Sequence, residues 1–563
     1  MTPTPSEKKS TDKRKRQDDK KGNGGSQVTK IISLVVAAKV ALFHTSGADP
    51  EGFASVPVDG HHETLRIGSK AFKYWLQHLY WNKHKSAINS QAMQGAIGLL
   101  RGQALFEGPM YPVFVRLAAL DGSIWLDLAN EKWQAMQIDS SGWRVVDKPA
   151  VRFIRPRGMM PLPIPKRGGK VDHLRRHLNF GSEDNWRLVV AWLVATLRPN
   201  GPYPVLGVHG EQGSAKSTLC RMLRSLVDPN EVDLRSEPQD ERDLMIAASN
   251  GWIIALENLS KIPPWISDAL CRLSTGGGFG TRELFSDGEE KLFNAKRPIM
   301  LNGINEVVTR SDLASRSLLI TLPTINDQER QTEDELWKQF EADKPKILGA
   351  LLDVVASALA NIGNVELECK PRMADFAVWA CAAEPALGWP AGSFLNAYSR
   401  NRTSANETAI ESCIVAEPFL SFMDGRNEWQ GTATELLAKL EGSTDERTTK
   451  QRDWPKRPHL LSSKLRRIAP NLRAMGIDLE FGKSGRRFIQ VTRTMAQSSV
   501  QSVPSVPTSS NGSTRASLER PVASEFSLAP SSTQPHSDAL DAADAVDANS
   551  PTSSEIEDDW GEL

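Results

Sequence analysis

The 563-residue sequence has few cysteines, few aromatic residues and no long hydrophobic run. The cysteines form no C-x-x-C pair and have no nearby histidine, which argues against a zinc site and a disulfide framework. They are Cys220, Cys271, Cys369, Cys381 and Cys413. The apolar stretch 31–43 is too short to span a bilayer and is interrupted by Lys39. We therefore expect a cytoplasmic protein without a membrane segment.

The formal net charge is zero because 68 basic residues balance 68 acidic ones, but the charges are unevenly placed. Residues 1–27 are basic and lack large apolar side chains after Met1, which predicts a disordered tail. Such a tail either holds nucleic acid electrostatically or is simply solvated, and both interpretations stay open. Residues 494–563 are rich in serine, proline and alanine and then acidic, which predicts a second disordered tail.

The clearest motif is PVLGVHGEQGSAKST at 204–218. An apolar run at 205–208 predicts a buried strand, a turn follows, and the residues from Lys216 onward open a helix, which is the context of a phosphate-binding loop. In such a loop, backbone N–H groups and the helix amino terminus bind phosphate oxygens. ATP and Mg²⁺ are therefore the expected cofactors, with Lys216 on the β- and γ-phosphates and Ser217 on Mg²⁺. The predicted nucleotide-binding residues are Gly210, Gly213, Ser214, Ala215, Lys216, Ser217 and Thr218.

Ala215 stands where the pattern G-x-x-x-x-G-K-[ST] has its second glycine. If the backbone needs a positive φ there, alanine is strained. The loop nevertheless resembles the G-x-x-G-x-A-K-S form of the minichromosome maintenance helicases. That resemblance implies that the alanine is compatible with nucleotide binding.

A second buried strand is predicted at 252–256 (WIIAL), and it ends in Glu257-Asn258. A carboxylate at a strand tip beside a phosphate-binding loop can bind the Mg²⁺ shell or activate water. We assign Glu257 as the metal-side or catalytic acid and Asn258 as a residue that orients water or senses the nucleotide. The alternative is a surface glutamate at the end of a strand.

Further motifs follow in a distinctive order. A Ser-Thr-Gly segment at 274–278 precedes a predicted hairpin at 282–293 with its turn at Asp287-Gly288, and a strand at 298–301 then ends in Asn302. Arg310 and Arg316 precede a last strand at 318–322. This order resembles the superfamily 3 helicases and the phage and poxvirus primase-helicase ATPases, a branch of the AAA+ proteins, over about 204–323.

The resemblance implies an α/β fold with an AAA+ type P-loop core and roles for several residues. Asn302 would align the attacking water, and Arg316, with Arg310 as the weaker alternative, would reach the nucleotide of a neighbouring subunit. The protein would then form a homo-oligomeric ring, a hexamer, whose hairpins hold one DNA strand in the pore. The pore candidates are Arg282, Lys291 and Lys296. The alternative is that these charges are solvated.

The chain is expected to have six parts. They are a disordered basic tail 1–27, an N-terminal α+β accessory module 28–165, the ATPase core 166–330, a helical lid and linker 331–425, a winged helix 426–493 and a disordered acidic tail 494–563. The accessory module has predicted helices at 71–79 and 91–100 followed by strand-like segments.

The winged-helix prediction has a helix at 435–440 capped by Thr432 or Thr434, helices at 462–468 and 471–475 separated by Pro470, and a hairpin at 477–491. Its basic surface indicates contact with duplex DNA, although many winged helices bind only protein. The predicted DNA-binding residues are Lys464, Arg467, Arg486 and Arg487.

The leading hypothesis is an ATP-dependent DNA helicase or translocase that acts in the replication of a phage, plasmid or integrated element, as the resemblance implies. The acidic tip 555–563 could dock on a replication protein or merely solubilise the chain. One alternative is an ATP-binding initiator or regulator of little unwinding activity, motivated by Asn258 in place of a second acid. Another is a defence-associated ATPase.

Overall fold

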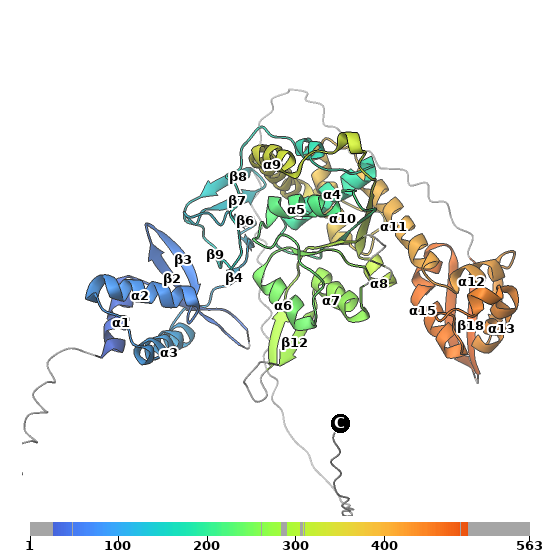
Figure 1. Ribbon diagram of the computed structural model, residues 1–563, viewed down its shortest axis with the longest axis horizontal. Coiled ribbons are helices and arrows are strands. Elements are labelled where there is room, and N and C mark those ends of the chain that lie inside the picture. Colours follow the sequence, from blue (N-terminus) through green and yellow to red (C-terminus); the bar gives the residue numbers. More distant parts are fainter. Residues whose placement is uncertain are drawn as a thin grey trace, which may run out of the picture. The chain divides into compact units, whose positions relative to one another are not determined.

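The computed structural model describes residues 26–493 except 48, 261, 283–289, 304–307, 309 and 485 (Figure 1). The described residues all belong to one compact unit. The predicted disordered tails lie outside the described residues, apart from Ser26 and Gln27, the last two residues of the basic one. So does the predicted hairpin turn at Asp287-Gly288.

The first part of the chain is a three-stranded antiparallel sheet with three helices. Its elements are α1 (Gln27–Ala37), β1 (Ala41–His44), β2 (Gly52–Val58), β3 (His61–Arg66), α2 (Lys70–His84) and α3 (Ser90–Phe106). The helices at 71–79 and 91–100 are thus confirmed, whereas the apolar stretch 31–43 divides into α1 and β1. Lys39 has a φ of 53° between them, and that turn ends the helix.

A four-stranded antiparallel meander follows, with turns at Asp121-Gly122 and Ser141-Gly142. The strands of the meander are β5 (Leu117–Leu120), β6 (Ser123–Asp127), β7 (Ala135–Asp139) and β8 (Gly142–Val146). The strands on either side of it in the chain, β4 (Val113–Phe114) and β9 (Arg152–Phe153), form a short parallel pair. Leu126 and Met136 share one hydrophobic core with Leu206, in the strand before the predicted phosphate-binding loop at 210–218, called the P-loop below. The predicted boundary at 165 therefore runs through a continuous core.

A buried ion pair connects this meander to the P-loop part. Arg116 and Asp228 are 0% and 1% exposed, and Arg116 Nε donates to Asp228 Oδ1 at 3.1 Å. The other carboxylate oxygen accepts from the backbone N–H groups of Trp252 and Ile253 at 2.8 and 3.0 Å. Asp228 caps the end of the P-loop helix, so this pair fixes that helix against both neighbouring segments.

The central sheet is parallel, in the order β11-β14-β10-β15. Its strands are β10 (Val205–Gly210), β11 (Ile254–Leu256), β14 (Ile299–Asn302) and β15 (Ser317–Leu322). The surrounding elements are η1 (Val171–Arg176), α4 (Glu183–Thr196), α5 (Lys216–Val227), α6 (Glu241–Asn250), α7 (Pro264–Thr275), α8 (Ser311–Ala314) and the hairpin β12 (Gly278–Arg282) and β13 (Glu290–Asn294). The predicted strands at 205–208, 252–256, 298–301 and 318–322 all lie in this sheet.

Alternate residues of these strands enter two different cores, as expected for a sheet covered on both faces. Met300 packs with α4 and α5, whereas its neighbours Ile299 and Leu301 pack with α6 and α7. Figure 1 shows α4 and α5 on one side of the sheet and α6 and α7 on the other. Ser182 caps α4 by accepting from Asn185 N.

The segment after the sheet is helical, as the predicted lid requires. Its elements are η2 (Asp327–Glu329), α9 (Glu333–Asn361), η3 (Ile362–Asn364), α10 (Ala374–Leu387), α11 (Ser393–Glu411) and α12 (Ala416–Met423). By length and composition, the helix from Glu333 to Asn364 could cross a membrane, but 56% of its apolar window is buried inside the protein. Leu348 and Leu351 belong to the same core as Leu206, so this apolar face is used for internal packing.

The last described part has a sheet of order β16-β18-β17 and its own core. Its elements are β16 (Glu428–Gly431), α13 (Ala433–Ser443), α14 (Glu446–Thr449), α15 (Pro458–Ala474), β17 (Ile477–Ser484) and β18 (Arg486–Arg493). Thr432 caps α13 in a capping box with Glu435, as one of the two predicted caps.

The predicted break at Pro470 is wrong, because α15 is one continuous helix through it. A proline inside a helix removes one hydrogen bond and crowds the preceding turn. Leu465, Ile468 and Leu472, on both sides of Pro470, are all buried in the same core. Burial of this apolar face therefore outweighs the local preference of the proline.

Candidate nucleotide-binding site

The P-loop leaves the carboxyl end of β10 and enters α5 at Lys216. Gly210 and Gly213 have φ of 150° and 87°, so the loop uses both glycines in conformations that other residues avoid. Ser214 is fully buried and its hydroxyl donates to Glu211 O at 2.8 Å. The strand–loop–helix arrangement predicted from 204–218 is present, and it directs the amino end of α5 toward the loop.

Lys216 folds over the loop. Its Nζ donates to the carbonyl oxygens of Gly210 and Glu211, both at 2.7 Å, and approaches Ser214 Oγ at 3.4 Å. Burial lowers the pKa of the Lys216 ammonium, because part of its solvation is lost. The ammonium is thus held at the mouth of the loop by weakly charged carbonyl oxygens that a phosphate could replace.

Ala215 has φ 61° and ψ 31°, a left-handed conformation at the position directly before α5. For a residue with a Cβ this conformation is less stable than the right-handed one by about 1–2 kcal/mol. Ala215 therefore has the backbone strain that the sequence predicts for an alanine with a positive φ at this position.

Ala215→Gly is expected to stabilise the fold by up to about 1 kcal/mol, because relief of this strain exceeds the roughly 0.4–1 kcal/mol of extra chain entropy that glycine adds to the unfolded state. Urea unfolding measures the change. As a control, Ala248→Gly within α6 should lower stability by at least about 1 kcal/mol, because glycine weakens the helix and the buried methyl group is lost. A loss of stability in Ala215→Gly would contradict the strain.

Asn302 connects three elements at the carboxyl edge of the sheet. It is 1% exposed, its Oδ1 accepts from Asn258 N at 2.9 Å, and its Nδ2 lies 3.5 Å from Ser217 Oγ. The nearby Cys220 thiol, whose pKa burial raises to about 12, is also hydrogen-bonded by Asn302. The structure therefore brings predicted Asn302 to predicted Ser217.

Glu257 and Asn258 follow the tip of β11, next to β14 in the sheet. Glu257 is half-buried and its charge acts on Cys220 of α5, so its carboxylate lies on the P-loop side. Asn258 is exposed with a φ of 55°, a conformation that asparagine tolerates better than most residues. Its backbone N–H donates a hydrogen bond to Asn302 Oδ1.

A cavity of about 500 Å³ opens beside the loop, with Ala215 and Thr218 in its wall. Asn179, Pro323 and Arg330 line it from other segments. Arg330 lies over the loop, since a Cβ on Gly213 would come within 2.9 Å of its Nη2. Sequence reasoning missed Asn179 and Arg330, because neither belongs to a spaced motif.

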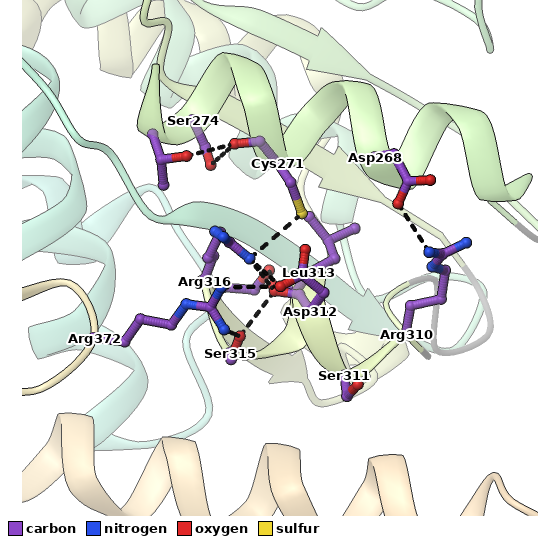
Figure 2. Close-up of polar contacts among 12 residues, drawn as sticks. Asp268, Cys271, Ser274, Arg310, Ser311, Asp312, Leu313, Ser315, Arg316 and Arg372 are labelled. Carbon is purple, nitrogen blue, oxygen red and sulfur yellow. Dashed lines mark hydrogen bonds and ion pairs between the residues drawn. The ribbon is translucent and has the colours of Figure 1, made fainter. Parts of the chain in front are cut away.

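Arg310 and Arg316, the two arginines predicted to reach a neighbouring subunit's nucleotide and called the finger candidates below, lie on either side of α8 (Figure 2). Arg316 precedes β15, and its Nη1 donates to Asp312 Oδ1 and, at 3.0 Å, to Asp312 O. Arg310 instead pairs with Asp268 at 2.8 Å. Because β10 and β15 are parallel and in register from Val205 to Gly210, Arg316 is roughly 15–20 Å from the P-loop of its own chain.

The predicted DNA-binding side chains are only partly described. Lys296 is exposed, with its methylene groups beside Gly276. On α15, Arg467 is exposed and Lys464 is partly exposed, and Arg487 is exposed on β18. The side chains of Arg282, Lys291 and Arg486 lie outside the described part of the structure.

Two family models match the chain. Residues 171–404 match the family of the actinomycete integrative conjugative element replication protein, and residues 415–507 match the C-terminal domain of the same RepA family. The two matches together span more than half of the chain. The chain belongs to this replication protein family. Every predicted nucleotide-site residue lies in the first RepA match, and Lys464, Arg467, Arg486 and Arg487 lie in the second.

The expectation of a replication protein of a mobile element is thus confirmed, while the assignment to superfamily 3 stays a prediction. Among solved structures, the RepA chain is similar to "The A form apo structure of NrS-1 C terminal region-CTR", at 10% identity and a TM-score of 0.37, over 84% of this chain and all of that one. A second structure of that region, 305–718, gives 10% identity and a TM-score of 0.34 over 83% of this chain and all of that one. No curated protein matches the sequence.

Proposed function

We propose that this RepA-family protein is an ATP-dependent DNA helicase or translocase in the replication of its conjugative element. The observation that carries the proposal is the meeting of Lys216, Ser217 and Asn302 at the carboxyl edge of a parallel sheet, beside a cavity large enough for a nucleoside. Ligands of open α/β sheets bind at this edge. A cytoplasmic location follows from such a role.

The residues present fit Mg·ATP. The ammonium of Lys216 and the N–H groups at the start of α5 would bind the phosphates, and the cavity at Thr218 would take the base and sugar. Arg330, which lies over Gly213, is positioned to bind the same phosphates from the other side. Ser217 and Glu257 would hold Mg²⁺, an ion that neutralises charge on the β- and γ-phosphates.

Hydrolysis requires a positioned water and stabilisation of negative charge at the γ-phosphate. The Nδ2 of Asn302 lies 3.5 Å from Ser217 Oγ, so the amide can orient a water beside the metal-binding hydroxyl. Glu257 would accept the proton of that water or bind the metal. The exposed side chain of Asn258 would orient water or sense the nucleotide, while its backbone N–H holds Asn302.

Arg316 would act on a neighbouring subunit. Its own P-loop is at the other end of β15, so the phosphate that it stabilises has to come from another chain. A closed ring, such as a hexamer, gives every nucleotide such a neighbour. In that ring Arg282, Lys291 and Lys296 would face the pore and hold a single strand.

The C-terminal part would bind duplex DNA as a winged helix. The helix α15 offers Lys464 and Arg467, and the β17–β18 hairpin offers Arg486 and Arg487. Ser311 Oγ donates to Arg467 O at 2.8 Å, so α15 directly contacts α8 beside the proposed finger. The acidic tip at 555–563 would recruit a further replication protein.

The second candidate is an ATP-binding initiator that hydrolyses ATP slowly. It is favoured by Asn258, because this exposed strand-tip residue provides no second carboxylate. A defence-associated ATPase has no specific support in the structure.

Strand displacement on forked DNA with Mg·ATP tests the proposal, together with ATP turnover stimulated by single-stranded DNA. Wild type is expected to unwind, and Lys216→Ala is expected to lose turnover and unwinding together, because the phosphates lose their ammonium partner. The exposed Lys338→Ala on α9 is the matched control and should behave as wild type. ATP binding without turnover in wild type would instead favour the initiator.

A further inference from the structure

Two arginines share one carboxylate at the corner between α8 and β15 (Figure 2). Arg372 Nη2 donates to Asp312 Oδ1 at 2.9 Å, and Arg316 Nη1 donates to the same oxygen. Arg372 Nη1 also donates to Ser315 Oγ at 2.7 Å. Burial raises the pKa of Asp312, but the hydrogen bond from Arg316 and the charges of both arginines hold it below its usual value. One anion thus lies between two guanidinium groups.

Among the residues that the structure describes, two guanidinium groups of this corner pair with one carboxylate. Arg316 and Arg372 both pair with Asp312, whereas the nearby Arg310 is paired with Asp268. The buried Nε of Arg316 has no hydrogen-bond acceptor in the part of the chain that the structure describes. The two guanidinium groups carry one more positive charge than the carboxylate between them, so an anion of higher charge could take its place.

The corner is accessible. The side chains of Arg372 and Asp312 are 41% and 49% exposed, so an anion from another molecule can approach them. Arg372 lies in the loop before α10, 60 residues after Asp312 in the sequence. Its guanidinium therefore reaches Asp312 through a tertiary contact between distant segments. The P-loop of the same chain is too far away to provide the anion, because the whole length of β15 separates the two.

We propose that Arg372 is a second trans-acting arginine, which together with Arg316 binds the terminal phosphates of the nucleotide held by the neighbouring subunit. Asp312 is the internal anion that keeps the two guanidinium groups together until that phosphate arrives. Guanidinium groups bind phosphate oxygens in pairs of parallel hydrogen bonds, so two arginines can hold two or three oxygens of one terminal phosphate. The proposal rests on the ATPase function proposed above.

A subunit-mixing experiment tests it. Arg372→Ala should lower ATP turnover at least about tenfold, and Lys216→Ala should be inactive. An equal mixture should exceed the sum of the two, because a Lys216→Ala subunit can lend its Arg372 to the intact P-loop of an Arg372→Ala neighbour. The exposed Arg400→Ala on α11 is the matched arginine control and should keep wild-type turnover.

The variant Asp312→Asn distinguishes a catalytic role of the two arginines from a purely structural one. It removes the internal anion but leaves both arginines, so turnover should stay within about twofold of wild type if the arginines act on phosphate. Turnover as low as in Arg372→Ala would assign the cluster a structural role and overturn the proposal. So would full turnover in Arg372→Ala, or a mixture no more active than the sum.

A DNA phosphate is the rival anion, and the same variant tests it. If Arg372→Ala weakens DNA binding while turnover without DNA is unchanged, the arginine binds DNA and the proposal fails. A wild-type chain without any ATP turnover would overturn the proposed function itself, which is a different result from a selective failure of Arg372.

Discussion

Asn302→Leu is expected to lower ATP turnover at least about a hundredfold, the size of effect seen when one oriented donor is removed from a reaction centre. Leucine has a similar volume but provides neither the amide donor near Ser217 nor the acceptor for Asn258 N. Turnover by the purified full chain, measured at saturating Mg·ATP, gives the result directly.

The fold should survive this change, because the removed groups lie at the edge of the sheet. An unfolding midpoint close to wild type is the required control, together with Asn401→Leu. Asn401 is likewise bonded to a strand, through Leu319, but away from the P-loop. That second variant should keep turnover. Normal turnover in Asn302→Leu would remove the proposed water-aligning role.

Arg116→Met is expected to destabilise the protein by about 3–5 kcal/mol, because Asp228 would remain buried without its countercharge. The substitution also removes the guanidinium donors of the carbonyl oxygens of Asp127, Met160 and Pro229, of which Pro229 O keeps the N–H of Met160. Urea unfolding of the full chain, followed by tryptophan fluorescence, measures the loss.

Adding Asp228→Asn should recover part of this loss. The asparagine removes the buried charge and keeps an oxygen for the N–H groups of Trp252 and Ile253. The exposed pair Arg175–Glu183 gives the comparison, since Arg175→Met should cost less than about 1 kcal/mol. Equal losses at the two positions would show that burial of the Arg116 pair contributes little.

Local sequence patterns were sufficient to predict the strands and the loop at the carboxyl edge of the central sheet. The apolar run before Gly210 and the strand that ends in Asn302 each depend on neighbours a few residues away, and each is present in the structure. The positive φ at Ala215 also followed from the glycine expected there.

Contacts between distant segments were not predictable in this way. Arg116 meets Asp228 and Arg372 meets Asp312 only because the fold brings them together, and no spacing in the chain marks either pair. Local preference also misled at Pro470, where burial of the apolar face of α15 keeps the helix continuous. The sequence shows which side chains are suited to a site, but the packing decides which of them meet.

Equilibrium binding of Mg·ATP to wild type and to Lys216→Ala tests the central claim most directly. The claim is that a triphosphate lies in the loop between β10 and α5, under the Lys216 ammonium. Wild type should bind saturably and Lys216→Ala at least about tenfold more weakly, since a charge-assisted contact to phosphate is lost. Equal affinities, or no binding by wild type, would contradict it.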